Sequence, residues 1–261
     1  MERNEYYNNV QVLFEIVKCL RGRETTFLSK NKCIRCIKVH KLNYLTQNMK
    51  AFNFWKTDYN LYYSLARLYG MPMFTFNLKK RKGQQAIFNE EFGKYLVGYD
   101  LGIDFDAHNY GFDVVYNDTK KIKEFFDEYK VPYELKFSGS GFHINVNHQH
   151  LPKVNNKHEF LKKSVDRLKT IFNCKTLDLG VYDIRRLWKV PYSYDVKTGN
   201  IALPLTDDQF DNFSKDMVKP ENVLKLNLLN RGLLEREGSR EGVTRFLIDF
   251  IVDEGDELGG T

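Results

Sequence analysis

Two carboxylates stand one residue apart in Asp104-Phe105-Asp106, at the end of the apolar-rich stretch 97–106. If this stretch is a β-strand, its side chains alternate, so both carboxylates face one side and Phe105 faces the other. Two hard oxygen ligands in that arrangement can share one divalent cation and hold a second nearby, as metal-assisted phosphoryl transfer requires. Acids also occur by chance at exposed strand ends, so the pair needs further residues around it.

A glycine-rich turn lies further along the chain, in Lys136-Phe137-Ser138-Gly139-Ser140-Gly141-Phe142-His143. Its two glycines permit unusual dihedrals and close backbone approach. Its two hydroxyls, its free amides and its lysine can cradle a triphosphate. His143 falls on the polar face of the strand that follows, where it can donate to a phosphate oxygen. The alternative is a structural hairpin with a satisfied histidine and no ligand.

A third acid, Asp178, sits in the apolar frame 177–181, where an unpaired carboxylate is costly unless a cation or donor satisfies it. The segment after it mixes cations with aromatic residues, namely Arg185, Arg186, Trp188, Lys189, Tyr192, Tyr194 and Lys197. Such a mixture suits phosphates and bases. The alternative is a solvated basic loop in which Asp178 pairs with a neighbouring arginine.

Helices and strands that must position these residues interleave along the chain. Apolar periodicity predicts helices over 5–20, 52–69, 119–129 and 157–172, and mostly helical structure over 207–250. From Met71 the pattern shortens to strand-like pieces, and the clearest strands are expected over 133–137, 142–146, 177–181 and 201–205. This order predicts an α/β (α+β) fold with a mixed β-sheet.

The three motifs in this order resemble those of the archaeo-eukaryotic primase superfamily: an Asp-x-Asp, a Ser-Gly-x-Gly-x-His turn, and a lone Asp behind an apolar residue. The run Pro191-Tyr192-Ser193 followed by Lys197-Thr198-Gly199 is similar to a segment that recurs after the third motif. The resemblance covers roughly 71–205. It implies a catalytic core of the primase small-subunit type, with a mixed sheet flanked by helices.

What the resemblance implies is a template-dependent nucleotidyltransferase that makes primers de novo on single-stranded DNA from NTPs or dNTPs and extends them. Two divalent ions, Mg²⁺ or Mn²⁺, would be bound by the catalytic residues Asp104, Asp106 and Asp178. Nucleotide-binding residues would be Lys136, Ser138, Gly139, Ser140, Gly141, His143, Arg186 and Lys189. DNA contacts would come from Arg185, Trp188, Ser193 and Lys197.

The expected organisation is a mainly helical segment over 1–70 packed on a catalytic core over 71–206, with a helical segment over 207–261 in the same domain. Primase small subunits usually carry a cysteine-rich zinc knuckle, often between the first two motifs, whereas 107–137 contain no cysteine. This favours a stand-alone primase-polymerase from a plasmid, virus or CRISPR-associated locus. The spacing of Cys33, Cys36 and His40, with Cys19 as a fourth ligand, leaves a zinc site as a further hypothesis.

The charge distribution agrees with a nucleic-acid partner. Residues 1–206 hold 33 Lys/Arg against 21 Asp/Glu, whereas 207–261 hold 7 against 13. A basic body attracts a phosphate backbone. No run of 18 apolar residues and no secretory signal is present, so we expect a cytoplasmic protein without a membrane span.

Three alternatives remain open. A primer-extending repair or gap-filling polymerase, like the ligase-associated domains of bacteria, shares these motifs. A non-catalytic single-strand-binding or replication-initiator module would explain the basic and aromatic residues without the three acids. A nuclease would use the acids, but it has no triphosphate for the glycine turn to cradle.

Overall fold

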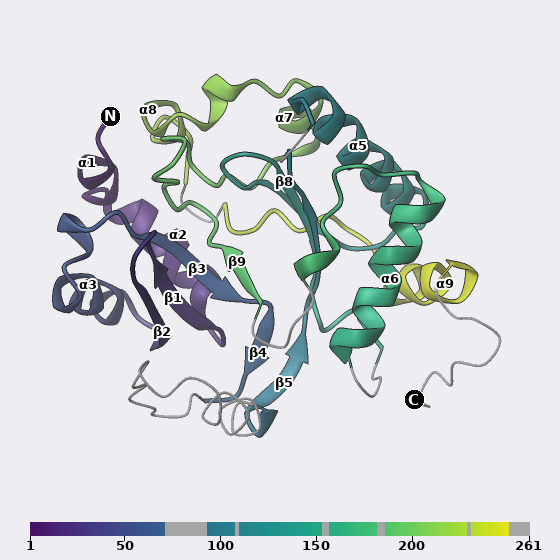
Figure 1. The fold of residues 1–261 in the computed structure, drawn as a ribbon, viewed down its shortest axis with the longest axis horizontal. Helices are drawn as coiled ribbons and strands as arrows, with labels where there is room; N and C mark the ends of the chain where they lie inside the picture. The colour runs from purple at the N-terminus through teal and green to yellow at the C-terminus, as the bar shows by residue number, and fades with distance from the viewer. Residues whose placement is uncertain (71–92, 108–109, 153–156, 182–185, 229–230, 251–261) are drawn as a thin grey trace.

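The structure, a computed structural model, describes residues 1–70, 93–107, 110–152, 157–181, 186–228 and 231–250. Three antiparallel sheets, of four, two and three strands, lie in the middle of the molecule, and helices lie outside them (Figure 1). The expected α+β class is confirmed. Every strand pairing within these ranges is antiparallel, so the predicted mixture of parallel and antiparallel pairs is not seen there.

Two helices open the chain, α1 (Arg3–Tyr7) and α2 (Val10–Leu20), where the pattern predicts a single helix over 5–20. The break falls at Asn9. Its side chain accepts hydrogen bonds from the amides of Gln11 and Val12 at 2.9 and 3.3 Å, so it caps a new helix.

The larger sheet has the strand order β2-β1-β3-β9. Its strands are β1 (Glu24–Leu28), β2 (Cys33–Lys38), β3 (Asn60–Ser64) and β9 (Leu187–Lys189). Between β2 and β3 the chain forms α3 (Leu42–Ala51) and the 3-10 helix η1 (Phe54–Lys56). Because β9 pairs with β3, a segment after the third acidic motif completes a sheet built by the N-terminal part of the chain.

The helix predicted over 52–69 is wrong. Besides η1, the structure has strands β3 and β4 (Ala66–Leu68) there. Leu61 and Tyr63 are buried, whereas Asn60 and Tyr62 are only half-buried, which is the alternation of a strand. Over so short a distance the leucines and tyrosines of this segment fit the repeat of a helix as well as that of a strand. Pairing in the sheet makes the segment a strand.

The three-stranded sheet, called the small sheet below, carries the first two motifs. β4 pairs with β5 (Leu96–Tyr99), and the chain continues through Asp100 into the three-stranded sheet of order β6-β8-β7. Its strands are β6 (Leu101–Phe105), β7 (Glu134–Phe137) and β8 (Phe142–Val146). The predicted hairpin over 133–146 is confirmed. One face of this sheet is wholly apolar and buried, with Leu101, Ile103, Phe105, Leu135, Phe137, Phe142, Ile144 and Val146.

Helices cover that apolar face. Figure 1 shows α5 (Phe112–Glu128) and α6 (Lys157–Ile171) on one side of the sheet, with α9 (Arg240–Phe250) beside α6. The helix predicted over 157–172 is confirmed. The one predicted over 119–129 begins seven residues earlier, and Thr119 is no cap: it lies inside the helix and donates to the Val115 carbonyl at 2.7 Å.

The C-terminal part is less regular than predicted. Residues 207–228 form only the short helices α7 (Asp207–Asp211), η3 (Lys215–Val218) and α8 (Pro220–Val223). The strand expected over 201–205 is reduced to single bridges from Ile201 to Tyr194 and from Pro204 to Lys136. Similarly, 177–181 form one bridge at Leu177 and a 3-10 turn, η2 (Leu179–Val181). The strand-like pieces expected from Met71 begin in 71–92, outside the described residues.

Segment 1–70 contains four strands besides its helices and shares a sheet with β9, so it is less helical than expected. The boundaries predicted at 70 and 206 stay predictions. None of the helices in the described ranges is long and apolar enough to cross a membrane.

Candidate active site

A row of three polar side chains crosses the second face of the small sheet. The strand register places Asp104 of β6 beside His143 of β8, and His143 beside Lys136 of β7. The His143 Nε2 atom lies 3.2 Å from Asp104 Oδ1. All three side chains are largely buried, so the row lies between the small sheet and the larger sheet rather than on the outside of the molecule.

The third acid lies next to this row. The Asp178 amide donates to the Asp104 carbonyl at 2.9 Å, and the Asp106 amide donates to the Thr176 carbonyl at 2.9 Å. Leu177 forms a bridge with Phe105 between these two bonds. The backbone therefore brings the first and third motifs together, although 73 positions separate Asp104 from Asp178 in the sequence.

One arginine joins the two acids. The Arg186 guanidinium lies 3.7 Å from Asp104 Oδ2 and 3.8 Å from Asp178 Oδ2, beyond hydrogen-bond distance from either. Asp178 is thus paired with a neighbouring arginine, as one reading of the sequence allowed, but the same arginine also serves Asp104. Arg185, expected to contact DNA, lies outside the described residues.

The glycine turn packs directly on the end of β6. A Cβ added to Gly141 would lie 2.0 Å from the Phe105 carbonyl oxygen and 3.5 Å from the Asp106 Cα, so only glycine fits. Gly139 has φ +113°, a conformation that other residues rarely adopt. The Ser138 hydroxyl accepts from the Gly141 amide at 3.3 Å. The second motif is therefore in contact with the strand that carries the first.

This turn has the features of an anion site. Ser140 is exposed, and within the described residues the amides of Gly139 and Ser140 have no hydrogen-bond acceptor. Successive free amides in a turn form a concavity that binds anions. The turn also contacts the Lys197-Thr198-Gly199 segment: Asn200 Nδ2 donates to the Gly139 carbonyl at 3.3 Å.

Asp195 organises that last segment. Its carboxylate accepts from the amides of Lys197 and Thr198 at 3.0 and 2.9 Å. A Cβ on Gly139 would lie 2.9 Å from Asp195 Cβ, so the two turns are closely packed. Lys197 itself is exposed.

Three residues expected to contact nucleotide or DNA are buried instead. Lys189 Nζ bonds Asp195 at 2.6 Å and Asn60 at 2.5 Å. The Ser193 hydroxyl donates to the Val190 carbonyl at 2.6 Å. Trp188 is 1% exposed and packs against His143. Their types and spacing suit a binding loop, but β9 turns this part of the loop inward, so their positions give no support to direct contacts.

Lys136, expected to bind phosphate, is also buried. Its ammonium donates to the Lys189 carbonyl and lies 3.5 Å from the Tyr63 hydroxyl. Burial lowers the pKa of Lys136 to about 7. In this position the ammonium is directed toward β9 and β3, so it joins the two sheets.

The electrostatics of the row favour an ionised aspartate beside a neutral histidine. Burial disfavours the charged form of Asp104, but His143 and Arg186 outweigh it and hold the pKa of Asp104 below its usual range. Burial likewise lowers the pKa of His143, against the attraction of Asp104. Its Nδ1 atom is buried without a partner in the described part of the chain.

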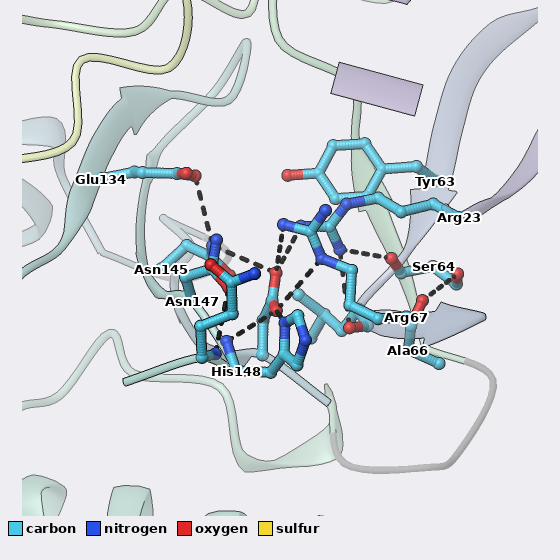
Figure 2. A network of polar contacts seen from close by, with 12 residues as sticks. Arg23, Tyr63, Ser64, Ala66, Arg67, Glu134, Asn145, Asn147 and His148 are labelled. Carbon is cyan, nitrogen blue, oxygen red and sulfur yellow. Dashed lines mark hydrogen bonds and ion pairs between the residues drawn. The ribbon is translucent and has the colours of Figure 1, made fainter. Parts of the chain in front are cut away.

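A second buried network is centred on Asp100, the residue directly before β6. Figure 2 shows the side chains of Arg23, Arg67, Asn145 and Glu134 that take part in it. Arg23 pairs with the Asp100 carboxylate, and Arg67 lies 3.3 Å from it. The Asn145 amide lies 3.4 Å from Asp100 and 3.2 Å from Glu134. Burial opposes ionisation of Asp100, but Arg23 and the other donors hold the pKa of Asp100 far below its usual range.

The sequence reading missed this network. Asp100 is only two positions before Gly102 and four before Asp104 in the same alternating series, which is the one signal that could have pointed to it. Its partners Arg23 and Arg67 come from the N-terminal part, whose strands were not foreseen. Arg23 also donates to the Ser64 carbonyl at 2.7 Å, so the network ties β6 to the larger sheet.

The residues present fit a hard divalent cation in charge and donor type. Asp104 and Asp178 are adjacent carboxylates that already share one positive group, and oxygen donors are what Mg²⁺ and Mn²⁺ prefer. The described residues hold no group of three or more His, Cys, Asp and Glu side chains close enough to bind a metal. Asp104, Asp106 and Asp178 therefore do not form a three-carboxylate group as they lie here, and an ion between Asp104 and Asp178 would take the place of Arg186.

The zinc hypothesis finds little support. Cys33 is half-buried in β2, and the His40 ring packs against Tyr44 with centroids 4.2 Å apart and planes tilted by 39°. Burial raises the pKa of Cys19 to about 12, which disfavours the thiolate that zinc needs. The Cys36 side chain lies outside the described residues. A zinc site stays a prediction, with no third ligand in what the structure describes.

By sequence, the chain matches no protein-family model and no curated protein. By structure, it is similar to the polymerase domain of Mycobacterium tuberculosis Ligase D in complex with DNA, at 11% identity and a TM-score of 0.56 over 89% of each chain. It is also similar to the catalytic domain of primase Repb' in complex with initiator DNA, at 9% identity and a TM-score of 0.42 over 83% of this chain and 97% of that chain. The first likeness shows a fold of the primase-polymerase kind, as the motifs predicted.

Proposed function

We propose that the chain is a template-dependent nucleotidyltransferase that starts primers on single-stranded DNA and extends them. The observation that carries the proposal is the contact of three distant motifs. Asp178 bonds to the backbone of Asp104, and the glycine turn rests on the end of the same strand. The fold shared with the Ligase D polymerase domain supports the same reading.

In the proposed reaction, a 3′-hydroxyl oxygen attacks the α-phosphorus of a nucleoside triphosphate and pyrophosphate leaves, while the hydroxyl loses its proton. Asp104, Asp106 and Asp178 would hold two divalent ions, Mg²⁺ or Mn²⁺. When bound, such ions lower the pKa of the attacking hydroxyl and neutralise charge on the leaving group.

The chain's own groups would then position the nucleotide. The free amides of Gly139 and Ser140 would hold phosphate oxygens, as amides in such turns do. Arg186 would move from its place between the two acids to the negative charge of the triphosphate. His143, whose Nε2 atom lies 3.2 Å from Asp104, would stabilise the negative charge that develops on the phosphate oxygens. Lys197 would contact the template backbone.

The test uses purified protein, labelled NTPs or dNTPs, Mg²⁺ or Mn²⁺, and single-stranded DNA with or without an annealed primer. We expect products on both templates. Extension without any product on unprimed DNA would instead favour the gap-filling alternative. DNA binding that persists in chelator, with no incorporation at all, would favour the non-catalytic alternative.

Asp178→Asn is the decisive variant, because it keeps the shape of the side chain and removes its charge. We expect incorporation to fall by about 1,000-fold or more, since losing a metal carboxylate removes about 4 kcal/mol of transition-state stabilisation. Asp58→Asn, at an exposed position, is the matched control and should leave the rate unchanged. Equal rates for the two variants would contradict the proposal.

A further inference from the structure

Trp188 of β9 lies between the larger sheet and the small sheet, where it contacts His143 of the candidate active site. Its ring packs on the His143 imidazole with centroids 4.0 Å apart and planes tilted by 36°. A Cβ on Gly102 would lie 3.1 Å from the Trp188 Cη2 atom, so the glycine leaves room for the indole against β6. The indole therefore fixes one side of the histidine that faces Asp104.

Lys136 holds the strand that carries Trp188. Its ammonium donates to the backbone carbonyl of Lys189, the residue next to Trp188. It also lies 5.1 Å from the centre of the Tyr63 ring and 5.7 Å from that of Trp188. Tyr63 and Trp188 are partners in the β3–β9 register, so one ammonium contacts both strands of the larger sheet.

Burying an ammonium in this place is costly, and the attraction of Glu134 and Asp104 offsets the cost only in part. Its burial lowers the pKa of Lys136 to about 7. An apolar side chain of similar length would fill the space without that penalty. Unlike an apolar side chain, the ammonium makes a hydrogen bond to one particular carbonyl and is attracted to two ring faces, so it fixes the position of the strand that carries them.

We propose that Lys136 is a positioning residue for the nucleotidyl transfer proposed above. By holding the Lys189 carbonyl, it keeps Trp188 against His143 and thereby fixes the imidazole beside Asp104. The inference rests on the proposed function for its kinetic consequences. Its structural half, the coupling of Lys136 to Trp188 and His143, can be measured without any nucleotide.

The chain has two tryptophans, Trp55 and Trp188, so a Trp55→Phe background gives a fluorescence signal from Trp188 alone. In that background Lys136→Met should change the Trp188 emission and increase its quenching by acrylamide, because β9 is no longer held on the small sheet. Lys162→Met, at an exposed site on α6, is the matched control and should match the parent.

Kinetics test whether Lys136 acts through the histidine. We expect kcat to fall by about 10- to 100-fold in Lys136→Met, the scale of effect that a misplaced active-site group produces. His143→Gln should lower kcat as well. The kcat of the double variant should be no lower than that of the less active single variant. Additive losses would overturn the proposal, as would an unchanged kcat with unchanged Trp188 emission.

A second variant keeps the test decisive if Lys136→Met does not fold. Lys136→Gln retains a donor, and it should give smaller changes of the same kind. If both variants lose cooperative unfolding in urea, Lys136 holds the whole core and the positioning role is wrong. If the parent protein incorporates no nucleotide but Lys136→Met still changes the Trp188 emission, the proposed function fails while the coupling stands.

Discussion

Gly141→Ala should separate the glycine turn from the strand that carries two of the three acids. The added Cβ would lie 2.0 Å from the Phe105 carbonyl oxygen, and Cβ atoms essentially never come closer than 3.0 Å to another heavy atom. The two segments must therefore move apart by about 1 Å. Both are backbone, so no side-chain rotation can relieve the contact.

The expected effects follow from that displacement. Overpacking of this size costs about 1–3 kcal/mol of the free energy of unfolding. A displacement of about 1 Å between a phosphate-binding turn and the acids should slow nucleotide incorporation by about 100-fold. The assays are urea unfolding and steady-state incorporation on a primed template.

Gly93→Ala is the matched control, because Gly93 is exposed and a Cβ there would have no atom within 4 Å. It should leave both the free energy of unfolding and the rate close to those of the parent. If Gly141→Ala also keeps both, the turn does not pack on β6 as described, and the geometric argument for a shared site is wrong.

Three further predictions concern charge. Arg23→Met leaves Asp100 buried without its main partner and should cost about 3–5 kcal/mol of the free energy of unfolding in urea, whereas Lys120→Met, at an exposed pair on α5, should cost less than about 0.5 kcal/mol. Burial raises the pKa of Glu134 to about 7, above its value in the unfolded chain. The folded state therefore binds the proton more tightly, and the free energy of unfolding should fall as pH rises from about 5 to 7. Glu134→Gln should flatten this pH dependence. Lys197→Ala should weaken single-stranded DNA binding and reduce the slope of log affinity against log salt by about 0.7, and an unchanged slope would remove this lysine from the interface.

Much of the fold around the site could be predicted from local pattern. The hairpin over 133–146 and the helix over 157–172 have strong periodicity and clear ends, and the structure confirms both. The helix predicted over 52–69 was wrong because the apolar residues there suit a helix and a strand equally well over a few residues. Only pairing with β1 and β9, which are distant in the sequence, makes it a strand.

The site shows the same division. Alternation along a strand correctly placed His143 on the face of its strand opposite Phe142 and Ile144, since it lies in the regular strand β8, but it did not predict that Asp104 is its neighbour. It could not show that Trp188, Lys189 and Ser193 turn inward, because that depends on β9 joining the N-terminal sheet. It could not show the Asp100 network either, because Arg23 meets Asp100 only when the two sheets pack together.

The most direct measurement is the single-turnover rate at which one nucleotide is added to an annealed primer, compared between the parent and Asp104→Asn. The variant keeps the size of the side chain, and Arg186, the positive partner that it leaves, is 29% exposed and can be hydrated, so the fold should be retained. We predict that addition slows by about 1,000-fold or more at saturating Mg²⁺ or Mn²⁺. Addition at the parental rate would contradict a catalytic centre at Asp104.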